Sequence, residues 1–112
     1  VSSRIREDAE LDWSKNVKEK TITNQILKYL KAQPCCFVFK EHGGLYGTSG
    51  IPDIICCYRG KFVAFEVKTE QGRLSKLQEI TIERIQQAGG VAAKITSLAE
   101  VKDILKGVMP AK

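Results

Sequence analysis

The sequence contains no apolar run that approaches the roughly 20 residues needed by a membrane-spanning helix. Residues 1–4 lack the charged-then-apolar pattern of a secretory signal peptide, so no membrane partner is expected. Internal repeats and low-complexity tracts are also missing, and the composition excludes collagen-like, mucin-like and disordered classes. The length of 112 residues suits one globular domain over residues 1–112. Because the chain begins at Val1 without a methionine, we expect it to be a trimmed or partial sequence.

The cysteines lack the spacing of a zinc site, in which two residues usually separate the paired ligands. The four cysteines form two adjacent pairs, Cys35-Cys36 and Cys56-Cys57. Adjacent residues of a strand point to opposite faces, so neither pair can turn both sulfurs toward one ion. We therefore interpret them as small apolar residues in two strands. Unpaired thiols fit a reducing compartment, and we expect a cytoplasmic location.

The formal net charge is +5, with a pI near 9.1. This excess of basic residues is compatible with a polyanionic partner such as nucleic acid. Many soluble domains carry such a charge without binding nucleic acid, so the net charge alone does not identify a partner.

The hydrophobic pattern predicts three helices and four strands. Residues 1–16 are expected to form a loosely ordered lead-in, and a glycine-rich loop follows the first strand. The predicted order is helix 16–33, strands 37–39, 53–58 and 61–68, helix 75–88, strand 91–95 and helix 98–106. Short connections make the first three strands antiparallel, and the helical crossover makes the last pair parallel. The expected fold class is α/β, with a mixed four-stranded sheet flanked by helices.

Charged residues end the strand predicted over residues 61–68. Its two faces are apolar along most of its length, so it should be central and covered on both sides. One face nevertheless ends in Glu66 and Lys68, and charges at the end of a buried strand are costly unless they are paired or used. A strand end that emerges into solvent, with a surface ion pair, is the simpler alternative.

Asp53 opens the neighbouring strand, and the hairpin places it beside Glu66 and Lys68. Two carboxylates held close together repel each other, and a hard divalent cation relieves this repulsion. An adjacent ammonium group can orient water or stabilise developing negative charge. These parts suffice for metal-dependent hydrolysis of a phosphodiester.

The same residues resemble a known nuclease signature. Pro52-Asp53, twelve intervening residues and Glu66-Val67-Lys68 resemble the PD-(D/E)xK motif. The stretches GIPDII (50–55), FEVK (65–68) and GRLSKLQ (72–78) are similar to the virus-type replication-repair nucleases, VRR-NUC, and the resemblance extends over residues 19–106. It implies a restriction-endonuclease-like αβββαβ core.

The resemblance also implies roles for individual residues. Asp53 and Glu66 would bind the metal together with the carbonyl of Val67, and Lys68 would be the catalytic lysine. Gln78 would support the site from the following helix. Because Ser75 lies three residues before Gln78, the alternative for Gln78 is a helix-capping box.

Glu19 corresponds to an acidic residue that the family often carries on its first helix. It shares a helical stripe with Ile22 and Ile26, which turns it toward the sheet. Its alternative role is a capping box with Asn16. The family often has a glutamine near Thr23, and this sequence departs from that pattern.

Four basic or titratable residues near the motif are candidate phosphate contacts. They are Lys40, His42, Arg73 and Lys76. The alternative for each is an ordinary solvated side chain, and for His42 a place in the flexible glycine-rich loop.

By resemblance, we expect a Mg²⁺-dependent endodeoxyribonuclease, with Mn²⁺ able to substitute. Its expected substrate is branched DNA such as four-way junctions, cut by a homodimer during phage or prophage replication or repair in a bacterial or phage-infected cell. Two alternatives stay open: a nucleic-acid-binding module without the chemistry, and a nuclease for flaps, duplex ends or RNA.

Overall fold

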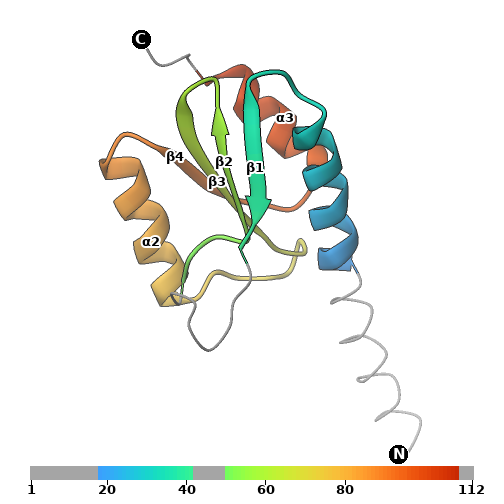
Figure 1. The fold of residues 1–112 in the computed structure, drawn as a ribbon. Coiled ribbons are helices and arrows are strands. Elements are labelled where there is room, and N and C mark those ends of the chain that lie inside the picture. Colours follow the sequence, from blue (N-terminus) through green and yellow to red (C-terminus); the bar gives the residue numbers. More distant parts are fainter. Residues whose placement is uncertain (1–17, 42–49, 109–112) are drawn as a thin grey trace, which may run out of the picture.

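A computed structural model describes residues 18–41 and 50–108 of the chain. The chain enters through an N-terminal helix, described over residues 18–31. The remaining elements are β1 (Cys36–Lys40), β2 (Ile54–Tyr58), β3 (Lys61–Val67), α2 (Lys76–Gln87), β4 (Val91–Ile95) and α3 (Leu98–Lys106). Figure 1 shows the sheet between α2 on one side and the N-terminal helix with α3 on the other. The predicted lead-in over residues 1–16 and most of the glycine-rich loop lie outside the described residues.

The four strands form one sheet in the order β1-β2-β3-β4. The pairs β1–β2 and β2–β3 are antiparallel, and β3–β4 is parallel. The short turn after β2 allows only an antiparallel return, whereas α2 carries the chain back to start β4 parallel to β3. The predicted α/β class and mixed sheet are confirmed.

The larger apolar core lies between the sheet and the pair formed by the N-terminal helix and α3. Ile26 and Leu30 recur at helical spacing and are fully buried, as are Phe65 of β3 and Val101 of α3. Apolar residues of β1 and β2 whose side chains lie on the same sheet face as Phe65 complete this layer. The core fixes which way each face of β3 points.

A smaller core lies under α2. Ala64, Ile82 and Ala92 are buried there, with Ile55 and Ile85 packed against them. The expectation that the central strand is covered on both faces is therefore wrong at one end. α2 packs against β4, and residues 63–67 of β3 are buried, but Phe62 stays 46% exposed.

Side-chain caps define the start of α2. The Ser75 hydroxyl accepts a hydrogen bond from the Gln78 N–H, and the Ser75 N–H donates to the Gln78 side-chain oxygen. This reciprocal arrangement satisfies two of the backbone donors that a helix start leaves unpaired.

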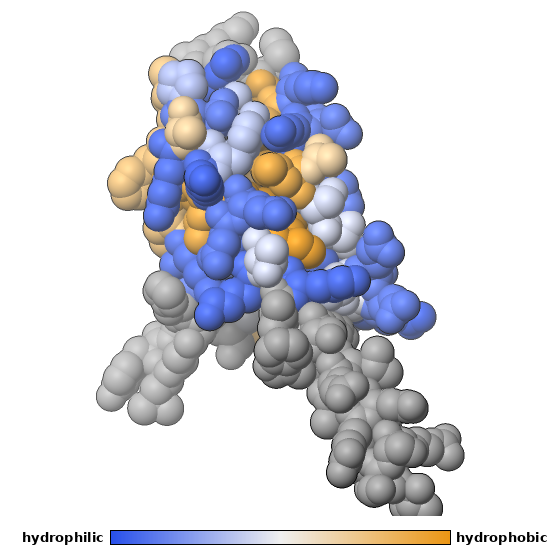
Figure 2. Space-filling model, turned by 90° about the vertical axis from the view of Figure 1, so that its right-hand side faces the viewer, coloured by the Kyte–Doolittle hydropathy of each residue, from blue (hydrophilic) through white to orange (hydrophobic). Residues whose placement is uncertain are grey.

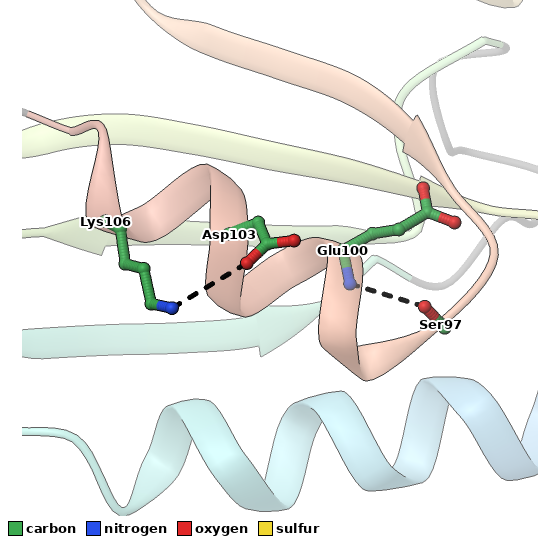
Figure 3. A network of polar contacts seen from close by, with 4 residues as sticks. All are labelled: Ser97, Glu100, Asp103 and Lys106. Carbon is green, nitrogen blue, oxygen red and sulfur yellow. Dashed lines mark hydrogen bonds and ion pairs between the residues drawn. The ribbon is translucent and has the colours of Figure 1, made fainter.

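A similar cap begins α3 (Figure 3). Ser97 accepts a hydrogen bond from the Glu100 N–H at 3.3 Å. In the last turn of α3, Asp103 and Lys106 form an exposed ion pair at 3.8 Å. Solvent screens such exposed pairs, so they contribute little to stability. The Ser97 cap sets where α3 begins, and the buried residues Val101 and Leu105 stabilise it.

The cysteines are all free thiols. Cys56 is buried and Cys57 exposed, as the alternation of a strand requires. Burial raises the pKa of the Cys56 thiol to about 12, so it is an inert core residue. The prediction is wrong for Cys35, which precedes β1 and has a positive φ of 56°.

The surface over the N-terminal helix is mostly hydrophilic, with apolar side chains visible between charged ones (Figure 2). None of the helices in the described part of the chain has the length and apolar character that crossing a bilayer requires.

We predict that Leu30→Ala lowers the free energy of unfolding by about 2–5 kcal/mol, because it leaves a cavity in the larger core. The neighbouring exposed change, Lys31→Ala, should alter it by less than about 0.5 kcal/mol. Urea denaturation of both variants measures the difference. Equal effects would contradict the packing of the N-terminal helix against the sheet.

Candidate active site

Asp53 and Glu66 lie side by side where β2 begins and β3 ends. The antiparallel register pairs Ile54 with Phe65, so Asp53, just before Ile54, lies opposite Glu66, just after Phe65. Asp53 Oδ2 accepts a hydrogen bond from the Val67 N–H at 3.0 Å, and its backbone oxygen accepts one from the Glu41 N–H at 2.7 Å. Asp53 is thereby held by both neighbouring strands.

Glu66 is a buried acid, with 3% of its surface exposed. Burial raises the pKa of Glu66 to about 8, since the charged form loses its solvation. A hydrogen bond with Asp53 and the charge of Asp53 raise the pKa further, and Glu19 adds to this. Lys68 opposes the rise. Glu66 therefore keeps its proton at neutral pH, where a second negative charge beside Asp53 would be repelled.

Lys68 follows β3 and is half-buried. Its N–H donates to the Ile95 carbonyl at 3.0 Å, which extends the β3–β4 pairing by one residue. The buried Gly72 packs against its side chain: a Cβ added there would lie 3.2 Å from Lys68 Cβ and 3.4 Å from Lys68 Cδ. A side chain at position 72 would press on the lysine stem, so this glycine helps to position the ammonium group.

Glu19 reaches the same region from the N-terminal helix. It is half-buried, and its charge acts on Glu66 across the end of the sheet. The hydroxyl of Thr23 donates to the Glu19 backbone oxygen at 2.8 Å, within the helix. The capping alternative involves Asn16, which lies outside the described residues.

Gln78 takes part in the capping box of α2, which uses its side-chain oxygen. The helix-capping role, which was the alternative for Gln78, is therefore present in the structure. A supporting role of Gln78 at the site stays a prediction. The role of the Val67 carbonyl as a ligand also stays a prediction.

Three of the four basic candidates lie in the part of the chain that the structure describes. Lys40 ends β1 opposite Ile54, Arg73 precedes α2, and Lys76 is its first residue. All three are exposed. His42 lies outside the described residues, so its proximity to the site stays a prediction.

Sequence reasoning missed Lys94. In the register of β3 and β4 it is the partner of Glu66, and its ammonium group donates to the Gly72 carbonyl at 3.4 Å. It is exposed, and its backbone is the neighbour of Glu66 in the sheet. The parallel register identifies it, and that register cannot be read from the spacing of the strands alone.

The donor set fits a hard divalent cation. Carboxylate oxygens are the ligands that Mg²⁺ and Mn²⁺ prefer, and the proton retained by Glu66 marks a position where positive charge is favoured. Within residues 18–41 and 50–108, no group of three or more His, Cys, Asp or Glu side chains is arranged to hold a metal. A cation at this pair would need backbone or water oxygens as well, which Mg²⁺ commonly retains.

Comparison with known proteins identifies the family. A sequence model of the VRR-NUC domain matches residues 6–99, most of the chain. The chain belongs to the VRR-NUC family. One solved structure, described as a VRR_NUC domain, has a TM-score of 0.68 and 23% identity, covering 82% of this chain and 98% of its own. Another, described as a VRR_NUC domain protein, has a TM-score of 0.63 and 16% identity, covering 79% and 84%. A search among curated proteins finds no match.

Membership of the VRR-NUC family confirms the resemblance seen in the sequence, and the two structures confirm the fold. The family is one of nuclease-type domains, which generally use divalent metals and act on DNA. The Asp53–Glu66 pair is therefore the candidate active site of a VRR-NUC domain.

We predict that stability without metal falls as the pH rises from about 4.5 to about 8. In that window folded Glu66 keeps a proton that the unfolded chain has released, so ionisation favours unfolding. Urea denaturation in a chelator measures this, and Glu66→Gln should flatten the dependence. The exposed control Glu70→Gln should keep the wild-type slope. A wild-type slope in Glu66→Gln would show that Glu66 is not the group whose proton is retained in the folded state.

Proposed function

We propose that this VRR-NUC domain is a Mg²⁺-dependent endodeoxyribonuclease that hydrolyses phosphodiester bonds. The observation that carries the proposal is the buried Glu66 in contact with the half-buried Asp53, with Lys68 beside them. A chain rarely buries a carboxyl group against a second one unless their charge is used, because the buried group loses solvation and the two repel each other.

Asp53 and Glu66 would hold the cation, with the Val67 carbonyl as a further ligand. Mn²⁺ is expected to substitute, since it prefers the same oxygen ligands. When bound, the cation would supply Lewis-acid stabilisation of the phosphate oxygens. Ionised Glu66 is the form that binds it, so binding releases the proton that Glu66 otherwise keeps.

Lys68 would act on the attacking water or on the developing negative charge at the phosphate. Gly72 lies close to the stem of Lys68, which would restrict the conformations of the side chain before substrate binds. Glu19 would add a third negative charge at the edge of the site, and Gln78 would support the site through its amide group.

The proposed substrate is branched DNA such as a four-way junction. Exposed Lys40, Arg73 and Lys76 at the same end of the sheet supply cations for phosphates around a cut, and His42 is a further candidate. The net charge of +5 favours a polyanion. We further propose a role in phage or prophage replication or repair, in the cytoplasm of the host cell.

We predict that Glu66→Gln and Lys68→Ala each lower the cleavage rate by roughly two orders of magnitude or more, while DNA binding in a chelator stays near the wild-type level. Nicking of labelled junctions with Mg²⁺, alongside a gel shift and thermal melting, measures this. Glu70→Gln is the control, since it removes one exposed acid outside the pair. Near wild-type cutting by Glu66→Gln would disprove the assignment. Binding without cleavage by the wild type on every DNA and RNA substrate would instead favour an inactive binding module.

We propose that the active form is a homodimer, because two symmetric nicks in a four-way junction require two sites related by a two-fold axis. Light scattering should give about twice the chain mass of 12.5 kDa. A cruciform plasmid should be linearised within one binding event. A monomer that leaves only nicked circles would contradict the dimer and favour a flap or single-nick nuclease.

A further inference from the structure

Three phenylalanine side chains lie exposed on the sheet face that α2 only partly covers. Phe37 is 72% exposed, Phe39 44% and Phe62 46%. Phe39 pairs with Ile55, which packs into the smaller core, so Phe37 and Phe39 lie on the sheet face that carries α2. Val38, between them, points to the opposite face and packs into the larger core. We call Phe37, Phe39 and Phe62 the phenylalanine strip.

The strip begins beside the acidic pair. Phe39 is the register partner of Ile55, two residues along β2 from Asp53. Residues two apart on a strand share a face and lie about 7 Å apart. Ala64 and Glu66 have the same relation on β3, and Ile55 is the partner of Ala64. Phe39 therefore lies on the face of the acidic pair, one strand across and two residues back, with Phe37 farther along β1.

The size of the strip does not suit a protein partner by itself. A fully open phenylalanine presents ~200 Å², so these exposures amount to about 300 Å² of apolar surface. A stable protein–protein interface buries about 800 Å² on each partner. The Phe37 and Phe39 rings have centroids 6.4 Å apart and planes tilted by 57°, so they do not stack face to face on each other. Their faces remain suited to small flat groups.

We propose that unpaired nucleotides of the substrate stack on Phe39 and Phe37 next to the scissile phosphate; this rests on the proposed nuclease function. Bases stack on aromatic side chains whatever their identity, and the adjoining phosphates need cations. Lys40 follows Phe39 at the end of the edge strand β1; the alternation of the strand turns its exposed side chain to the other face, so it can reach a phosphate only around the sheet edge. A single strand that leaves the acidic pair along this face thus passes from carboxylates to aromatic rings.

The proposal defines the substrate class more narrowly. DNA with unpaired nucleotides beside the cut, as in a flap, a loop or an opened junction, would gain contacts that a fully paired duplex cannot make, because its bases are already stacked. The strip would then select structure and not sequence.

Equilibrium binding of fluorescein-labelled DNA in a chelator tests the proposal without any cleavage. The probes are a blunt duplex, the same duplex with a tail of about ten thymidines, and the tailed duplex with abasic tail positions. The tail should tighten wild-type binding at least tenfold, since each stacked base contributes roughly that factor. The abasic tail should lose most of this gain.

The variant Phe37→Ala/Phe39→Ala should lose the gain from the thymidine tail and bind the blunt duplex as the wild type does. Phe37→Trp/Phe39→Trp should keep the gain, and Phe37→Leu/Phe39→Leu should lose it, because leucine keeps apolar area and cannot stack. Ile80→Ala is the control, since it removes an exposed apolar side chain from α2. Thermal melting checks that each variant is folded.

A tail gain that survives in the alanine or leucine variant would overturn the proposal. So would conversion of a dimer to a monomer by the alanine variant with retention of the dimer by the leucine variant, since the strip would then be a contact between copies. Because no cleavage occurs in a chelator, an inactive enzyme would leave the tail gain measurable. Loss of the gain would in turn leave the assignment of Asp53 and Glu66 untouched.

Discussion

The burial of the Glu66 carboxyl group against Asp53 is the interaction on which the site depends. Glu66 lies at the end of a central strand whose preceding residues build two cores, so its position cannot relax without disturbing both. Without a cation, burial and then the contact with Asp53 raise the pKa of Glu66, so Glu66 keeps a proton that relieves the repulsion between the two acids. The same arrangement makes the pair receptive to a divalent cation, whose charge replaces that proton.

The surrounding fold holds this pair in place. Asp53 is bonded to the backbone of both neighbouring strands, and the β3–β4 pairing fixes the backbone of Lys68. The N-terminal helix contributes Glu19 through a core anchored by Ile26 and Leu30. The site is therefore built on strands and a packed helix, which keeps its groups oriented before substrate arrives.

Much of this arrangement is readable from the sequence, because the local signals agree with one another. The turn at Arg59-Gly60 sets the β2–β3 register, and that register alone predicts that Asp53 meets Glu66. Other features depend on packing that no local pattern encodes. Lys94 becomes a neighbour of Glu66 only through the parallel register with β4, and the exposure of Phe37 and Phe39 follows from where α2 packs. The dual meaning of Gln78, as cap or site residue, also needed the structure to show where its oxygen is used.

The most direct test of the central claim is an NMR titration of the Glu66 side-chain carboxyl carbon, with and without Mg²⁺. The pKa of this carboxyl group should be about 8 in a chelator, because of burial and contact with Asp53. With saturating Mg²⁺ the same carbon should titrate far lower, since the cation favours the ionised form. An ordinary glutamate pKa near 4.5 in the chelator, unchanged by Mg²⁺, would contradict the central claim.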